Sequence, residues 1–134
     1  MQENETTQTI HKVSSLWCSA VKGYMALAQI LVEFGKADVN STSDSGSTPI
    51  RSACFMNKIE IVKYLVKNGA NINKPNLNGG TCLINSVQNL ELCQFLISNG
   101  AEINAQDMHG KTALHYTVHE NKTHTMRVLI MVQM

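Results

Sequence analysis

Apolar residues recur along this chain with the spacing of a helix, in short runs separated by polar turns. In the clearest stretch two apolar triplets stand at positions i, i+3 and i+4: Ile50, Ala53, Cys54 and then Val62, Leu65, Val66. That spacing places each triplet on one helix face, so the stretch predicts two short helices joined at about Asn57-Lys58. Helices this short cannot bury their apolar faces alone, and the pair therefore needs neighbours.

The ends of these two helices carry their own signals. Thr48 is a typical helix cap, and Pro49 suits the first helical turn because its missing N–H costs no hydrogen bond there. Gly69 follows the second helix and supplies the left-handed residue that ends it. The stretch from Thr48 to Asn73 is therefore a complete unit of helix, turn, helix and extended exit.

The same unit recurs along the chain. Thr48 is repeated at Thr81 and Thr112, in steps of 33 and 31 residues. The exit segment 69–73 is repeated at 100–104 and, in a form one residue longer, at 35–40. This period and these signals resemble the ankyrin repeat, whose helix pairs stack and whose loops project to one side. The resemblance implies an all-α solenoid of about four helix-turn-helix repeats with short hairpin loops.

The period divides the chain into a tail and an array. The expected tail covers 1–12 and the array covers 13–134, with repeats at about 13–43, 44–76, 77–107 and 108–134. The tail is polar, so we expect it to be disordered. In the first repeat we expect Ser14 as the cap and a second helix over 26–34 that is stopped by Gly35.

The third repeat is shorter than the second. Between Thr81 and Gly100 it has two residues fewer than the second repeat has between Thr48 and Gly69. We place the loss in the inter-helix turn near 88–89, because shortening a surface turn disturbs packing least.

The fourth repeat is incomplete. Its second helix is expected over 124–132, and Gln133 stands where the pattern needs a glycine. The final residues are mainly apolar, whereas a terminal repeat usually has a polar outer face. Either the array continues in a longer protein, which we favour, or a partner covers this end.

Composition narrows the classes of function. Lys and Arg total 11 against 10 Asp and Glu, so the chain lacks the basic excess of nucleic-acid binders and of proteins that bind anionic membranes. It has neither a secretory signal nor an apolar run of membrane-spanning length. The four cysteines form no Cys-x-x-Cys pair and are expected to be reduced and mostly buried. We therefore expect a cytoplasmic protein, with the nucleus as the alternative location.

Candidate chemistry is sparse. His115 and His119 share a helix face, as a metal pair would, but no His-Glu-x-x-His motif is present. His115 also occupies a position where its ring can bond the cap threonine, and we favour that structural role over zinc. No nucleophile elbow, phosphate loop or paired-carboxylate arrangement is found, so we expect no enzyme activity and no cofactor.

Stacked helix pairs offer a long concave surface instead of a deep pocket, which favours protein or peptide binding. The third residue after each cap should line that surface, and so should the seventh: Trp17, Arg51, Ile84, His115 and Val21, Phe55, Gln88, His119. Among them Trp17, Arg51 and Phe55 would form an aromatic and cationic cluster typical of binding hot spots. The alternative is that Arg51 is a solvated surface charge and Trp17 only fills space. We favour recognition because the chain has few aromatic residues.

Four short motifs carry a closer likeness. They are Leu16-Trp17-Cys18-Ser19-Ala20, Ser47-Thr48-Pro49-Ile50-Arg51-Ser52-Ala53-Cys54-Phe55, Thr81-Cys82-Leu83 and Thr112-Ala113-Leu114-His115. In order and spacing they resemble the ankyrin repeats of the feminization (Fem) family, which are substrate receptors of cullin–RING ubiquitin ligases. The ankyrin groove of that family captures C-terminal segments of substrates, known as C-degrons.

The resemblance implies that Trp17, Ser47, Arg51 and Phe55 match groove positions that bind a peptide. It also implies a partner protein with an exposed C-terminus, and binding of ligase subunits only through regions outside this sequence. The alternative is a truncated or degenerate ankyrin scaffold, or a competitor of a full-length receptor, with no ligase role.

Overall fold

A computed structural model of the chain describes residues 15–134. The expected tail over 1–12 and the expected cap Ser14 lie outside the described residues. The described part is helical and contains no strand. After a first helix over 15–22 come α2 (Met25–Glu33), α3 (Pro49–Phe55), α4 (Ile59–Lys67), the 3-10 helix η1 (Ile84–Ser86), α5 (Leu90–Ser98), α6 (Ala113–His119) and α7 (Thr123–Met131).

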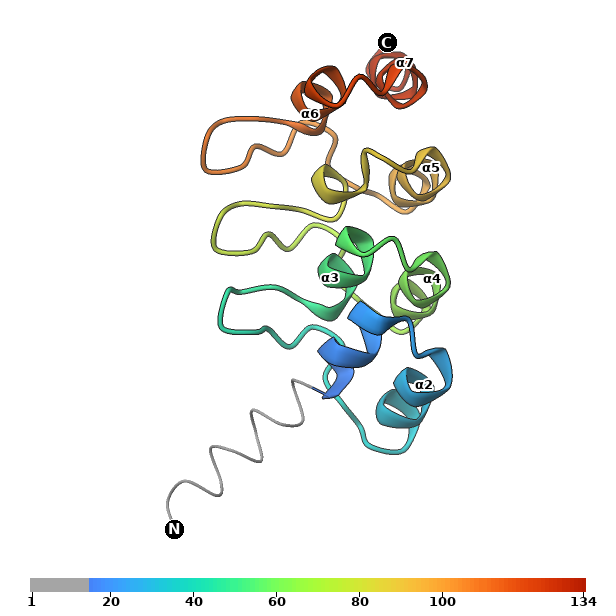
Figure 1. The fold of residues 1–134 in the computed structure, drawn as a ribbon. Helices are drawn as coiled ribbons and strands as arrows, with labels where there is room; N and C mark the ends of the chain where they lie inside the picture. The colour runs from blue at the N-terminus through green and yellow to red at the C-terminus, as the bar shows by residue number, and fades with distance from the viewer. Residues whose placement is uncertain (1–14) are drawn as a thin grey trace.

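These helices form two stacked layers. Figure 1 shows α3 and α6 in an inner column beside the loops, and α2, α4, α5 and α7 in an outer column. The loops project to one side, and each is closed by a backbone hydrogen bond: Ser43 N–H to Ser47, Asn76 N–H to Gly80 and Asp107 N–H to Lys111, at 2.9, 3.0 and 2.9 Å. The predicted all-α solenoid with short hairpin loops is confirmed.

Hydroxyl caps begin the first helices as predicted. The Thr48 side chain accepts a hydrogen bond from the Arg51 N–H at 3.3 Å, and the Thr81 side chain accepts one from the Ile84 N–H at 3.2 Å. These bonds satisfy backbone donors that have no partner inside a helix.

Left-handed residues end the second helices. Gly69 and Gly100 have φ angles of 89° and 92°. The N–H groups of the alanines that follow them donate to Leu65 and Leu96, at 2.9 and 3.0 Å. In the longer first repeat Lys36 holds this place with φ 49°, so Gly35 is not the left-handed residue of that helix end.

The predicted position of the two-residue loss in the third repeat is wrong. The inter-helix turns 56–58, 87–89 and 120–122 have equal lengths, so no residue is missing from the turn. Instead the first helix is reduced, from seven residues in α3 and α6 to three in η1. The two missing residues therefore shorten the inner layer, beside the loops.

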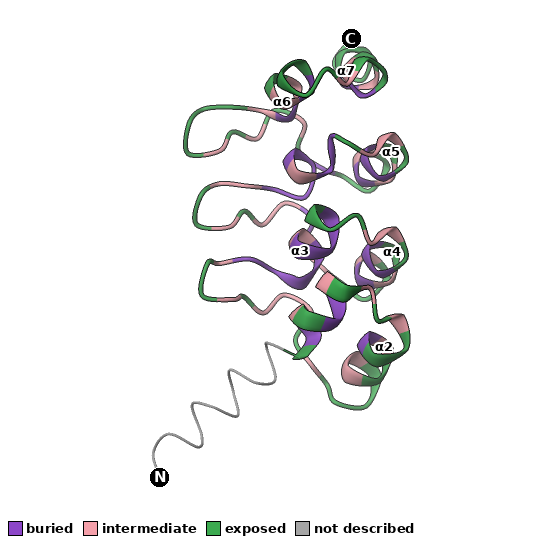
Figure 2. Cartoon of the chain, in the orientation of Figure 1, coloured by how far each residue is buried: buried purple, intermediate pink, exposed green. Residues whose placement is uncertain are grey.

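The core lies between the two layers (Figure 2). It is aliphatic, and its largest fully buried side chains include Leu16, Ile50, Leu65, Leu92, Leu96 and Leu129. Three cysteines, Cys54, Cys82 and Cys93, are buried in it, while Cys18 is exposed. Burial raises the pKa of the Cys93 thiol to about 12, which makes that thiol unreactive at neutral pH.

Polar side chains tie each repeat to the next. The Asn40 amide donates to the Gly69 carbonyl at 3.1 Å, and its oxygen accepts from the Asn71 N–H at 2.7 Å. Asn73 repeats both bonds with Gly100 and Glu102, at 3.0 and 2.8 Å. We call Asn40 and Asn73 the asparagine clamps.

Candidate functional site

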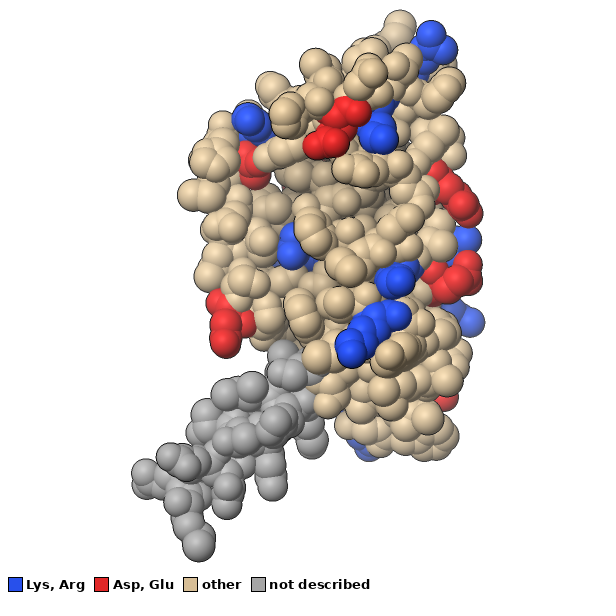
Figure 3. Space-filling view, viewed as in Figure 1, with Lys and Arg blue, Asp and Glu red and all other residues tan. Residues whose placement is uncertain are grey.

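A cavity of about 690 Å³ lies between the loops and the inner helices. It spans the second, third and fourth repeats, and its lining includes Arg51, Phe55, Ile84, Asn85, Gln88, Asp107, Met108, Tyr116 and Glu120. Figure 3 shows this face hollowed between the loops and the helices, with both blue and red side chains around the hollow. We call this cavity the groove.

Arg51 enters the groove from α3 and is held from two sides. Its Nε donates to the Ser47 hydroxyl at 2.7 Å, and its Nη1 donates to the Asn85 side-chain oxygen at 2.6 Å. Ser47 in turn exchanges a hydrogen bond with the Ser52 hydroxyl at 2.8 Å. Burial lowers the pKa of Arg51, but a guanidinium stays charged at any physiological pH.

This charge has no carboxylate partner in the part of the chain that the structure describes. The ion pair found there joins Lys63 and Glu91, at 3.9 Å, on the outer helices. Because a guanidinium can only donate, the oxygen of the Asn85 amide faces Arg51 and the amide NH₂ remains available. Arg51 Nη2 and the Asn85 NH₂ make no hydrogen bond within residues 15–134, so an incoming oxygen could use both.

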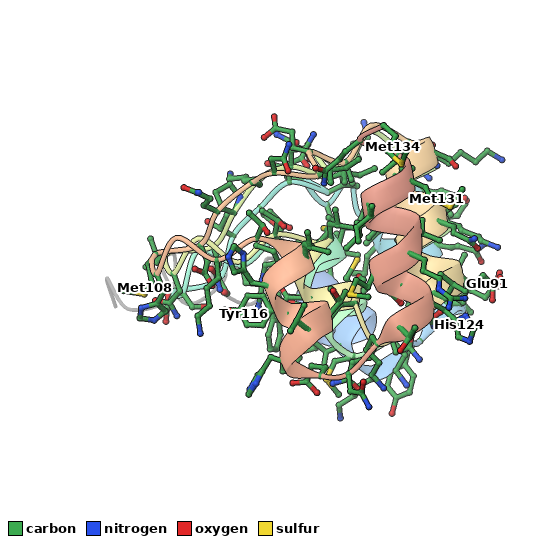
Figure 4. All side chains as sticks on the ribbon, turned by 90° about the horizontal axis from the view of Figure 1, so that it is seen from above. Glu91, Met108, Tyr116, His124, Met131 and Met134 are labelled. Atoms are coloured by element: carbon green, nitrogen blue, oxygen red, sulfur yellow. The ribbon has the colours of Figure 1, made fainter. Side chains whose placement is uncertain are left out.

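Two carboxylates, Asp107 and Glu120, line the far end of the groove, and the Lys111 ammonium lies beside them, 5.8 Å from the centre of the Tyr116 ring. Asp107 Oδ1 accepts from the N–H groups of His109 and Lys111, at 2.9 and 3.0 Å, and Oδ2 accepts from the Tyr116 hydroxyl. The Tyr116 bond is the main reason that the pKa of Asp107 is lowered. Glu120 lies beyond it and accepts from the Gln88 amide at 3.3 Å. Figure 4 shows Tyr116 on α6, on the side of the loop that carries Met108.

The structure separates the four residues that the sequence singled out. Arg51 and Phe55 line the groove, and the Phe55 side chain is 64% exposed. Ser47 is buried behind Arg51 and fixes its guanidinium, so it supports the groove without lining it. Trp17 is half-buried, does not line the groove, and its indole N–H has no hydrogen-bond partner among the described residues. Peptide binding by these residues stays a prediction.

In the fourth repeat the spacing rule selected the wrong side chains. His115 and His119 do not line the groove, and Tyr116 and Glu120 do, one position later on each turn. His115 instead caps its own helix, because its Nδ1 lies 3.0 Å from the Thr112 N–H and 2.9 Å from the Thr112 hydroxyl. The structural role that we favoured for His115 is confirmed, and no group of three or more metal-ligating side chains exists within residues 15–134.

Stacked helix pairs with loops on one side and a groove beneath them define a repeat solenoid built for binding. The sequence matches two family models of ankyrin repeats. One, described as "Ankyrin repeats (3 copies)", matches residues 2–76, and the other, described as "Ankyrin repeats (many copies)", matches residues 88–130. The chain belongs to the ankyrin-repeat family. Ankyrin repeats are protein–protein interaction modules and are typically non-catalytic.

Two of the curated relatives illustrate the matches, which cover short segments. The chain is 36% identical over 58 residues to alpha-latrocrustotoxin-Lt1a of Latrodectus tredecimguttatus, a match that covers 43% of this chain and 4% of the toxin. It is 33% identical over 61 residues to the palmitoyltransferase akr1 of Schizosaccharomyces pombe, covering 46% of this chain and 10% of that enzyme. The matches span a small part of both relatives. In the structure, no helix within residues 15–134 is long and apolar enough to cross a membrane.

Proposed function

We propose that the groove binds an extended segment of a partner protein and that Arg51 takes a carboxylate of that segment. One observation carries the proposal: a half-buried guanidinium faces the groove and is held by two neutral oxygens, with no carboxylate partner within residues 15–134. A cation that is already positioned and partly desolvated binds a carboxylate more strongly than a mobile surface lysine does.

The distribution of charge gives the ligand a direction. Arg51 lies at the second repeat, while Asp107 and Glu120 lie at the fourth. A carboxylate at the fourth-repeat end would meet two like charges, which disfavours the reversed orientation. Exposed Phe55 and Met108, one at each end, offer apolar surface to side chains of the ligand.

We further propose that the carboxylate is a free C-terminus, as the likeness of the run 47–55 to the Fem family implies. A library of peptides that display free C-termini tests this, with each selected peptide then compared with its C-terminal amide. We expect the amide to bind more weakly by about 1–3 kcal/mol, because a charge-assisted bidentate contact is lost. Equal binding of acid and amide would reassign the ligand to an internal acidic residue.

The groove itself is tested by substitution. We expect R51A to weaken a selected peptide by about 1–3 kcal/mol, the usual cost at a buried hot spot. K67A is the matched control, since Lys67 is exposed at the end of α4, away from the groove, and its loss changes the net charge equally. A titration in which R51A and K67A bind like the parent protein would remove Arg51 from the site.

The finest form of the proposal is a substrate-recognition segment of a cullin–RING ubiquitin ligase receptor that works in the cytoplasm or nucleus. It is supported by the Fem-like motifs of the sequence. Affinity purification of the tagged protein from cells tests it: elongin and cullin in the complex would support a ligase role. Their absence, with peptide binding intact, would favour the scaffold or competitor alternative.

A further inference from the structure

The outer face of the first repeat exposes an apolar side chain at a position that is buried in the second and third repeats. Leu27, the third residue of α2, is 46% exposed, whereas the third residues of α4 and α5, Ile61 and Leu92, are 1% and 0% exposed. All three have the first helix of their own repeat beside them. The difference is that Ile61 and Leu92 also have a preceding repeat, so this position is one that a preceding repeat covers.

The outer face of the fourth repeat exposes an apolar side chain at a position that the following repeat covers elsewhere in the array. Val118 is 65% exposed, whereas Cys54, at the same distance from its cap, is 2% exposed. Cys54 lies close enough to Cys82 of the following repeat to raise the pKa of the Cys82 thiol, so the following repeat covers this position inside the array. Figure 4 looks onto the uncovered face, with Met131 at the end of α7 and Met134 beyond it.

The two faces also match each other in polarity. Inside the array, the last residue of α2 and the sixth residue of α4 meet, because the Tyr64 hydroxyl donates to Glu33 at 3.4 Å. At the two outer faces the same positions are the last residue of α7 and the sixth residue of α2. They are Met131 and Ile30, which are 70% and 54% exposed. A polar pair inside the array is thus replaced by an apolar pair across the two ends.

We propose that copies of this chain stack head to tail, with the fourth-repeat face of one copy packed on the first-repeat face of the next. A second copy is the fitting occupant because one chain carries both halves of the same inter-repeat interface. Each junction would continue that interface, with Leu27 and Ile30 of one copy under Val118 and Met131 of the other. Such a contact is heterologous, so it leaves both outer ends open and assembly grows with concentration.

Sedimentation velocity across a concentration series tests the proposal. The parent protein should rise in mass with concentration, and L27E and V118E should each stay monomeric, because a buried unpaired carboxylate opposes packing. An equimolar mixture of the two variants should form a dimer of twice the monomer mass and stop there. Each variant retains one intact face, and only the two intact faces can meet.

The matched control is F55E, which introduces the same charge at an exposed groove residue and should assemble like the parent protein. Circular dichroism should show all three variants folded, since the three side chains are exposed in the single chain. Self-association of V118E would indicate pairing of two first-repeat faces and overturn the head-to-tail arrangement. A parent protein that stays monomeric at every concentration would overturn the proposal, and it would leave peptide binding in the groove untouched.

Discussion

A guanidinium that is hydrogen-bonded to neutral oxygens keeps its full charge for a ligand, whereas one paired with a carboxylate does not. Arg51 donates to a hydroxyl of Ser47 and to the amide of Asn85, and neither bond cancels its charge. The sequence could indicate Arg51 and Phe55 as groove residues, because their spacing from a recognisable cap fixes the helix face. It could not indicate Asn85, which comes from the next repeat and reaches Arg51 only when the third repeat packs against the second.

At the same scale, Asp107 shows how one hydrogen bond changes the pKa of a carboxylate. Its pKa is lowered, with the Tyr116 hydroxyl as the largest cause. Y116F should therefore move the pKa of Asp107 back up towards its ordinary value, as followed by the chemical shift of the Asp107 carboxyl carbon in a pH titration. V118A, a change on an exposed neighbouring side chain, is the control and should leave the pKa in place.

The sign of the effect on stability follows. A carboxylate whose pKa is lower in the folded state stabilises the fold above its unfolded-state pKa, and this contribution is lost as pH falls through the folded-state value. The parent protein should therefore lose more stability on acidification than Y116F does. Identical acid titrations of the two proteins would show that the Tyr116 bond does not tune Asp107.

At the scale of elements, helix ends were readable where one residue decides them. Thr48 and Thr112 begin helices because a hydroxyl satisfies an orphan N–H, and Gly69 ends one because it tolerates a positive φ. The first repeat was misread because its insertion moved the left-handed position to Lys36, and sequence favours glycine there. The third repeat was misread because two residues lost from the first helix and two lost from the inter-helix turn have the same effect on length.

We predict that the asparagine clamps, although exposed and polar, contribute measurably to the free energy of unfolding. N73A removes one donor and one acceptor that bridge two repeats, so we expect the free energy of unfolding to fall by about 1–2 kcal/mol in urea denaturation. N104A is the control, because Asn104 ends the next exit segment and makes no side-chain hydrogen bond within residues 15–134. Equal losses in the two variants would show that the bridging bonds are not the cause.

For the whole molecule, the core is continuous, and the main helix–helix contacts within residues 15–134 join each repeat to the next. The prediction of an aliphatic solenoid succeeded because periodicity reports burial directly. The groove was predicted only in part: the loops supply Asp107 and Met108, and how far a loop reaches over a helix layer is set by the stacking of whole repeats.

Because packing joins each repeat to the next, we predict that the terminal repeats are less stable than the inner ones. The fourth repeat is covered on one side, so amide protons of α7 should exchange faster than those of α4 and α5 at concentrations where the chain is monomeric. L129A, in α7, should release the fourth repeat alone, whereas L65A should destabilise the whole array by about 2–5 kcal/mol. Both leucines are fully buried, so the contrast tests position in the array. Hydrogen-exchange mass spectrometry that finds uniform protection would instead indicate one cooperative unit.

The reduced inner helix of the third repeat has a consequence for recognition. In a stack of identical units a bound segment could slide by one unit and find the same contacts again, so nothing would fix its register. Here η1 stands between two full helices, and it lines the groove. This shortened helix breaks the translational symmetry of the surface, and a ligand that fits beside it is held at one place along the array.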